Sequence, residues 1–209
     1  MDPTASLVAL LGLGAFHGIN PGMGWLFAVA LGLQERRRGA VWRALLPLAL
    51  GHSLAVAAAV AMALALGLVL SIEHLRWPVG LVLLALGASR FVRHRHPRWA
   101  AMRVRMARLT LWSFLMASAH GAGLMVVPVF AAMSSGEPLA CHSHPASATI
   151  GSALLATGVH GLGYVVVTAA IAVLVFEKVG VGILRTAWVN IDLVWALALV
   201  STGLFTVLS

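Results

Sequence analysis

Long uncharged apolar runs alternate with short polar segments along the whole 209-residue chain. Several of these runs exceed the roughly 18 residues that mark a membrane-spanning helix. We predict six spans, which lie near residues 5–33, 44–70, 75–92, 109–133, 148–176 and 187–208. The pattern therefore predicts an all-α integral membrane protein with one transmembrane domain over residues 1–209.

The first apolar run has a polar interruption in its middle, with the sequence His17-Gly18-Ile19-Asn20-Pro21-Gly22-Met23-Gly24. Proline inside a helix removes a hydrogen bond and frees a carbonyl. In lipid, such a break survives only where protein or a polar cavity satisfies the freed groups. We therefore predict that the first helix is broken at Asn20-Pro21-Gly22 and that the break lines a site.

Basic residues gather in the loops that follow the first, third and fifth spans, which hold 13 of the 14 lysines and arginines. Because positively charged loops stay in the cytoplasm, this asymmetry predicts a cell inner-membrane protein with both termini on the outer side. The same loops account for the net charge of +8, so a nucleic-acid partner is not expected. The arginine-rich third loop is an orientation signal or, alternatively, a surface for lipid headgroups or a regulator.

Two histidine positions recur in the two halves of the chain, at offsets of 103 and 108 residues. The pairs are His17 with His120 and His52 with His160. Each half holds three spans, and an odd number inverts the second half relative to the first, as in many secondary transporters. We predict two inverted three-helix repeats, over about 5–92 and 109–208. The Asn-Pro-Gly element is absent from the second half, so the halves are expected to contribute unequally to a site.

Four histidines at similar depth, in two repeated pairs, favour a shared site, whereas a single one would more simply be a structural hydrogen-bonding residue. Neutral imidazole binds transition metals well and exchanges them for protons near neutral pH. The predicted metal ligands are His17, His52, His120 and His160. Residues predicted to bind substrate or to couple transport are Asn20, Pro21, Met23 and Asp192. Methionine as simple packing and Asp192 as an interfacial residue are the alternatives.

The fourth loop, predicted to face outward, carries a short cluster of Cys141, His142 and His144. A thiolate and two imidazoles could capture or release a metal at the outer mouth, and an ordinary polar loop is the alternative. Cys141 is the only cysteine, so an intrachain disulfide is not expected.

A histidine followed by Pro21-Gly22 in the first span, and Gly51-His52-Ser53 in the second, resemble the nickel/cobalt exporter (NicO-type) group of the lysine-exporter superfamily of six-span transporters. The resemblance implies nickel or cobalt efflux across a bacterial inner membrane. It also implies that the transport site includes His17, Asn20, Pro21 and His52.

This chain departs from the NicO-type pattern at two places. Met23 stands where the first motif of that group has a second histidine, and only His142 and His144 replace a long histidine-rich loop.

We therefore expect a secondary transporter of a divalent or soft transition-metal ion, with proton-coupled export through a midplane histidine site. The expected partners are the ion as substrate, protons and membrane lipid, with no organic cofactor and with a homo-oligomer left open. One alternative is a redox protein that holds haem b between histidines such as His52 and His160. Another is an exporter of a small organic solute. An enzyme is not expected, because the chain has no His-Glu-x-x-His and no Gly-x-Ser-x-Gly motif.

Overall fold

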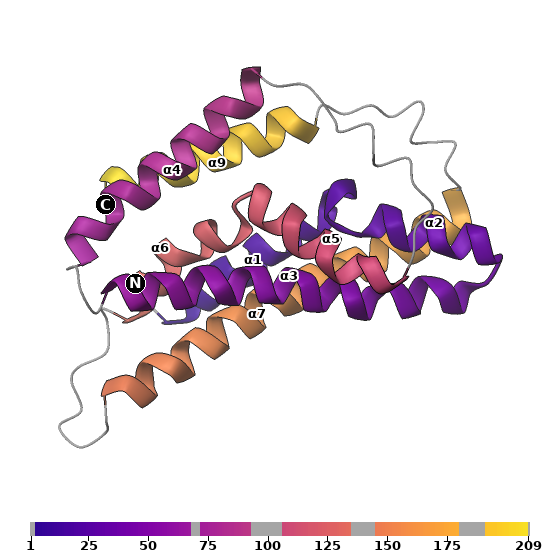
Figure 1. The fold of residues 1–209 in the computed structure, drawn as a ribbon, viewed down its shortest axis with the longest axis horizontal. Coiled ribbons are helices and arrows are strands. Elements are labelled where there is room, and N and C mark those ends of the chain that lie inside the picture. Colours follow the sequence, from indigo (N-terminus) through magenta and orange to yellow (C-terminus); the bar gives the residue numbers. More distant parts are fainter. Residues whose placement is uncertain (1–2, 68–71, 93–105, 135–144, 180–190, 209) are drawn as a thin grey trace.

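The computed structural model describes residues 3–67, 72–92, 106–134, 145–179 and 191–208. The elements in these ranges are all helical, as predicted, and no strand occurs among them. In chain order they are α1 (Pro3–Ile19), the 3-10 turn η1 (Pro21–Met23), α2 (Trp25–Glu35), α3 (Arg38–Gly67), α4 (Ile72–Val92), α5 (Met106–Ala119), α6 (Ala122–Ser134), α7 (Pro145–Leu174), the π-helical turn η3 (Val175–Val179) and α9 (Ile191–Leu208) (Figure 1).

The longest helices have the character of membrane spans. In the described part of the chain, α3 and α7 are each long and apolar enough to cross a bilayer, and the bent pair α5–α6 gives a third candidate. The outward faces expose large apolar side chains, such as Val8, Leu46 and Leu154, which are 67–70% exposed. Such surfaces suit lipid contact. The helices α1, α2, α4 and α9 are apolar but shorter, so the six-span inverted repeat stays a prediction.

The first predicted span is broken where the sequence indicates. The helix α1 ends at Ile19, and Asn20 adopts an extended backbone with φ −69° and ψ 121°, as a residue before proline favours. The Oδ1 atom of Asn20 accepts a hydrogen bond from the backbone N–H of Gly22 at 2.8 Å. The indole N–H of Trp25 donates to the carbonyl of Ile19 at 2.8 Å. The break therefore satisfies part of its own freed backbone, as a chain in lipid requires.

A second break, which the sequence analysis missed, interrupts the fourth predicted span. The helices α5 and α6 are bent by 61° where they meet at His120 and Gly121. Gly121 has a φ of +71°, in the left-handed region that glycine adopts without a steric penalty. The first and fourth predicted spans are therefore both broken, one by an Asn-Pro-Gly turn and the other by a single glycine.

Replacing Gly121 with alanine is expected to lower the free energy of unfolding by about 1–2 kcal/mol, because a Cβ strains the left-handed backbone. Gly158→Ala is the matched control, since Gly158 lies inside α7 with nothing within 4 Å of an added Cβ. That control should stabilise the helix by roughly 0.5–1 kcal/mol. Unfolding in mixed detergent micelles, followed by circular dichroism, measures both. Equal stability of the two variants would contradict the left-handed turn.

Glycines bring together the backbones of the helices that carry the histidines. A Cβ added to Gly14 of α1 would overlap the carbonyl oxygen of His160 in α7. From the other side, a Cβ on Gly163 of α7 would overlap the carbonyl oxygen of Leu11 in α1. Glycines at such positions let two helix backbones pack closely in a membrane. They fix how far α1 lies from α7, and therefore how far the histidines of the two helices lie from each other.

The helices α4 and α9 lie side by side and form a pair beside the other helices (Figure 1). Gly80 and Gly87 of α4, and Gly203 of α9, face the partner helix with no room for a larger side chain. The pair approaches the rest of the bundle at the second break, where a Cβ on Gly121 would lie 3.1 Å from the side chain of Leu199. This pair therefore packs against the turn that carries His120.

Candidate functional site

Three of the four predicted histidines lie in direct contact. His17 comes from α1, His52 from α3 and His160 from α7, and all three side chains are fully buried. Their ring centroids are 5.6 Å apart for His17 and His52, 5.1 Å for His17 and His160, and 5.3 Å for His52 and His160. We call these three residues the histidine cluster.

A hydrogen bond between two ring nitrogens joins His52 and His160 in the histidine cluster. Their Nε2 atoms are 3.2 Å apart, within hydrogen-bond distance, and their ring planes differ by 9°. Two nitrogen ligands of one tetrahedral ion, each bound at about 2.0–2.1 Å, lie roughly 3.3 Å apart. A hydrogen shared by these two nitrogens and a metal ion bound to both would therefore compete for the same pair of nitrogens.

His17 and His120 make equivalent hydrogen bonds, each at a helix break. The Nδ1–H of His17 donates to the carbonyl of Leu13 at 2.6 Å, and the Nδ1–H of His120 donates to the carbonyl of Met116 at 2.8 Å. A carbonyl can only accept, so the hydrogen is on Nδ1 and the lone pair of each neutral ring is on Nε2. His120 is 5% exposed and lies within electrostatic range of His17. Both rings therefore present Nε2 as the nitrogen able to bind a metal.

Tyr164 of α7 is part of the site, and sequence reasoning missed it. Its ring stacks on His52, with centroids 3.9 Å apart and planes 7° from parallel. Its hydroxyl donates to the carbonyl of Met23 at 2.7 Å. A signal was present, because Tyr164 is the only tyrosine in the chain and follows His160 by four residues. Residues four apart lie on one face of a helix.

The remaining predicted site residues lie in different parts of the chain, and some fall outside the described residues. Asn20 and Pro21 form the first break, where the side chain of Asn20 holds the turn. Met23 is 1% exposed and packs in the hydrophobic core. Asp192 lies in the first turn of α9. The predicted outer-loop ligands Cys141, His142 and His144 lie outside the described residues.

The histidine cluster is held closed by hydrogen bonds. Among the residues that the structure describes, no group of three or more His, Cys, Asp or Glu side chains is arranged to hold a metal ion. The His52–His160 hydrogen bond takes the position between two of the nitrogens, and His17 is fixed to Leu13 through Nδ1. Binding an ion at this cluster would therefore require the Nε2 atoms to reorient toward one centre.

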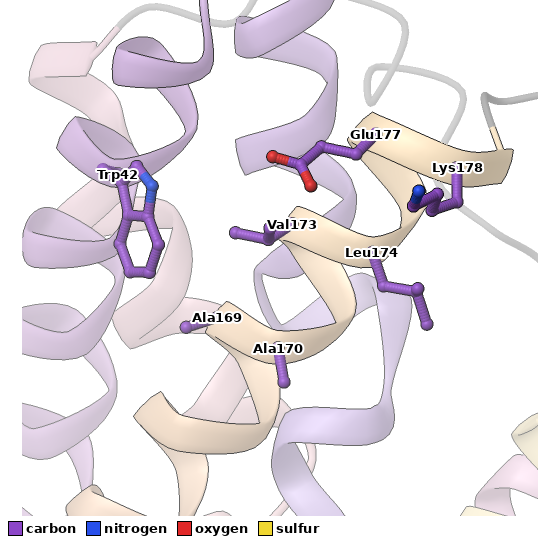
Figure 2. Close-up of a pocket in the computed structure, with 7 residues that line it drawn as sticks. All are labelled: Trp42, Ala169, Ala170, Val173, Leu174, Glu177 and Lys178. Atoms are coloured by element: carbon purple, nitrogen blue, oxygen red, sulfur yellow. The ribbon is translucent and has the colours of Figure 1, made fainter.

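A surface pocket of about 310 Å³ lies farther along α7 (Figure 2). It is lined by Trp42 on α3 and by Ala169, Ala170, Val173, Leu174, Glu177 and Lys178 on α7 and η3. Its nearest α7 residue follows His160 by nine positions, which is about 14 Å along a helix. Glu177 also pairs with Arg38, with Oε1 and Nε 2.9 Å apart. This pocket is therefore separate from the histidine cluster.

Comparison with known proteins assigns no family to this arrangement. No protein-family model matches the chain, and no curated protein or solved structure matches it either.

Proposed function

We propose that the chain is a multi-pass membrane transporter that carries a divalent or soft transition-metal ion through the histidine cluster. The observation that carries the proposal is the contact of three fully buried imidazoles from α1, α3 and α7. Ionisable side chains inside a membrane are costly, and they usually mark an ion or proton pathway. Imidazole nitrogens suit nickel, cobalt, zinc and copper.

Matched positions in the two halves support an inverted repeat around the site. His17 and His120 each stand at a helix break with the same Nδ1 hydrogen bond. His52 and His160 meet each other through the same nitrogen, with nearly parallel rings. Residues related by a two-fold axis can contact each other in this way only close to that axis. In secondary transporters with inverted repeats, the substrate site lies at this interface near the bilayer midplane.

In the proposed cycle, protons and the ion compete for the imidazole nitrogens. The ion enters when the hydrogen between His52 and His160 moves from Nε2 to Nδ1 of the ring that carries it, so that both neutral rings offer a lone pair on Nε2. The lone pair of His17 on Nε2 then completes a three-nitrogen set. The two halves then rock against each other and expose the cluster to the other side. Protonation of the imidazoles on that side releases the ion, and the protonated carrier then returns to its first orientation. Because protons compete with the ion, metal binding weakens as the pH falls.

The contact geometry favours an ion over the haem alternative. A haem iron bound by two histidines needs a porphyrin plane between their nitrogens. The Nε2 atoms of His52 and His160 are 3.2 Å apart and in direct contact, which leaves no space for that plane. A small organic solute stays as the second candidate, because half-helix ends at a break can bind a carboxylate.

Direction and ion identity in the proposal come from other features. We infer from the basic residues after the first, third and fifth predicted spans that these loops lie in the cytoplasm, with both termini outside an inner membrane. The resemblance to the NicO-type group favours efflux of nickel or cobalt. His120, Asn20 and Asp192 are proposed to assist the cluster.

Metal analysis tests the proposal. Protein purified in mild detergent is challenged separately with Ni, Co, Zn and Cu, desalted, and analysed by elemental mass spectrometry. The wild type should retain close to one ion per chain, and a His17→Ala/His52→Ala double variant should retain none. Thr206→Ala is the matched control, because Thr206 is a buried polar residue of α9 that donates to the carbonyl of Thr202 at 2.8 Å.

The outcomes separate the two candidates. Retention by the wild type and by Thr206→Ala, with loss in the double variant, supports a metal site at the cluster. Absence of all four metals from the wild type would overturn the proposal and favour the organic solute.

A further inference from the structure

We propose that Tyr164 is a positioning residue that restrains the ring plane of His52 and connects His52 to the broken first span. The inference rests on the proposed function, because it names the residue that orients one metal ligand. It follows from two separate contacts of the same side chain, one made by the ring and one made by the hydroxyl.

The ring contact restrains the plane of the His52 imidazole. The two rings are 3.9 Å apart at their centroids and 7° from parallel, and Tyr164 is 1% exposed. A rotation of the imidazole about its Cβ–Cγ bond would drive its edge into the phenol ring. Partners that orient a metal-binding histidine in this way tune both affinity and geometry.

The hydroxyl contact connects the same side chain to the break after His17. The Tyr164 hydroxyl donates to the carbonyl of Met23 at 2.7 Å, and the hydroxyls of Ser113 and Thr168 lie beside it. Gly24 makes the approach possible, since a Cβ there would lie 2.6 Å from the phenol oxygen. A movement of the break is therefore passed through Tyr164 to the ring of His52.

The two contacts can be separated by two substitutions. Tyr164→Leu removes both the stacking ring and the hydroxyl, whereas Tyr164→Phe keeps the ring and removes only the hydrogen bond to Met23. Phe27→Leu is the matched control, because it removes another aromatic contact, the edge-to-face pair of Phe27 on α2 with Trp112, whose ring centroids are 5.1 Å apart. Unfolding of the metal-free proteins measures any general loss of stability.

The test is a titration with Co(II), whose visible absorption spectrum reports ligand geometry, combined with uptake rates in proteoliposomes. Tyr164→Leu should weaken Co(II) binding by about tenfold or more, the size expected for loss of an orienting partner, and should change the spectrum. Tyr164→Phe should restore the wild-type spectrum and affinity but should transport several-fold more slowly. Phe27→Leu should match the wild type in spectrum and affinity.

Each outcome has a distinct meaning. Wild-type spectrum and affinity in Tyr164→Leu would overturn the positioning role while leaving the metal site intact. A Tyr164→Phe variant that transports at the wild-type rate would overturn the connection to the break. Failure of the wild type to bind Co(II) or any other tested metal would overturn the proposed function itself, and the role of Tyr164 with it.

Discussion

Replacing His52 with alanine is expected to abolish metal loading and transport. His52 contacts both other members of the histidine cluster and shares its Nε2 hydrogen bond with His160. Loss of a direct ligand should weaken binding by more than the roughly 10–100-fold that loss of an outer partner costs. Uptake of radioactive nickel or cobalt into proteoliposomes, with metal content measured on the same samples, checks this result.

A second substitution at the same residue separates chemistry from packing. His52→Gln places an amide near the position of Nε2, so it can still hydrogen-bond to His160, but an amide oxygen is a poor ligand for soft transition metals. We expect the His52→Gln variant to unfold at a higher temperature than the His52→Ala variant. Neither variant should bind metal. Ser53→Ala, the next residue along α3, should transport normally. Transport at the wild-type rate by His52→Gln would show that His52 serves only as a hydrogen-bonding residue.

Replacing Gly14 with valine is expected to prevent α1 from docking on α7. A side chain at Gly14 would overlap the backbone carbonyl of His160, and backbone cannot move aside as a flexible side chain can. Overpacking in well-packed interiors costs about 1–3 kcal/mol, and we expect this substitution to lie at or above the upper end. The measurement is thermal unfolding in detergent, together with the fraction of monodisperse protein on size-exclusion chromatography.

The same helix supplies the control for this packing prediction. Gly12 of α1 has nothing within 4 Å of an added Cβ, so Gly12→Val should fold like the wild type. Gly163→Val tests the same contact from α7, since its side chain would overlap the carbonyl of Leu11, and it should be as damaging as Gly14→Val. If Gly14→Val proved as stable as Gly12→Val, the close packing of α1 on α7 would be refuted, and with it the position of His17 beside His160.

The two large effects act on different properties of the molecule. The His52 variants are expected to keep the fold and lose the ion, whereas Gly14→Val is expected to lose the contact on which the cluster depends. Together they distinguish a histidine cluster that serves transport from one that only fills the interior between helices.

The sequence by itself determined the features that depend on neighbouring residues. Long apolar runs predicted the helices, because a backbone in lipid must bond within its own helix. Asn20 and Pro21 predicted the first break, because proline acts on the residues directly around it. The histidines stood out because a polar side chain inside an apolar run needs a partner.

Only the tertiary structure decided which of these residues meet. His52 and His160 are 108 residues apart in the chain, and their contact depends on the rotation of α3 and α7 about their own axes. Apolarity is nearly uniform around a membrane helix, so periodicity does not specify that rotation. Close contacts at Gly51 of α3 and Gly163 of α7 specify it instead, because an added Cβ at either position would overlap a backbone carbonyl oxygen of the helix packed against it. A glycine in an apolar run does not reveal which helix it faces.

The turn at the second break and the contacts of Tyr164 both depend on packing between distant segments of the chain. Gly121 adopts its left-handed turn beside Leu199 of α9, whereas most glycines in the sequence lie inside helices. Tyr164 takes its role from the face of His52 and from the carbonyl that the first break exposes at Met23. Local sequence determined the helices and the first break. Packing between distant segments determined which residues meet at the site.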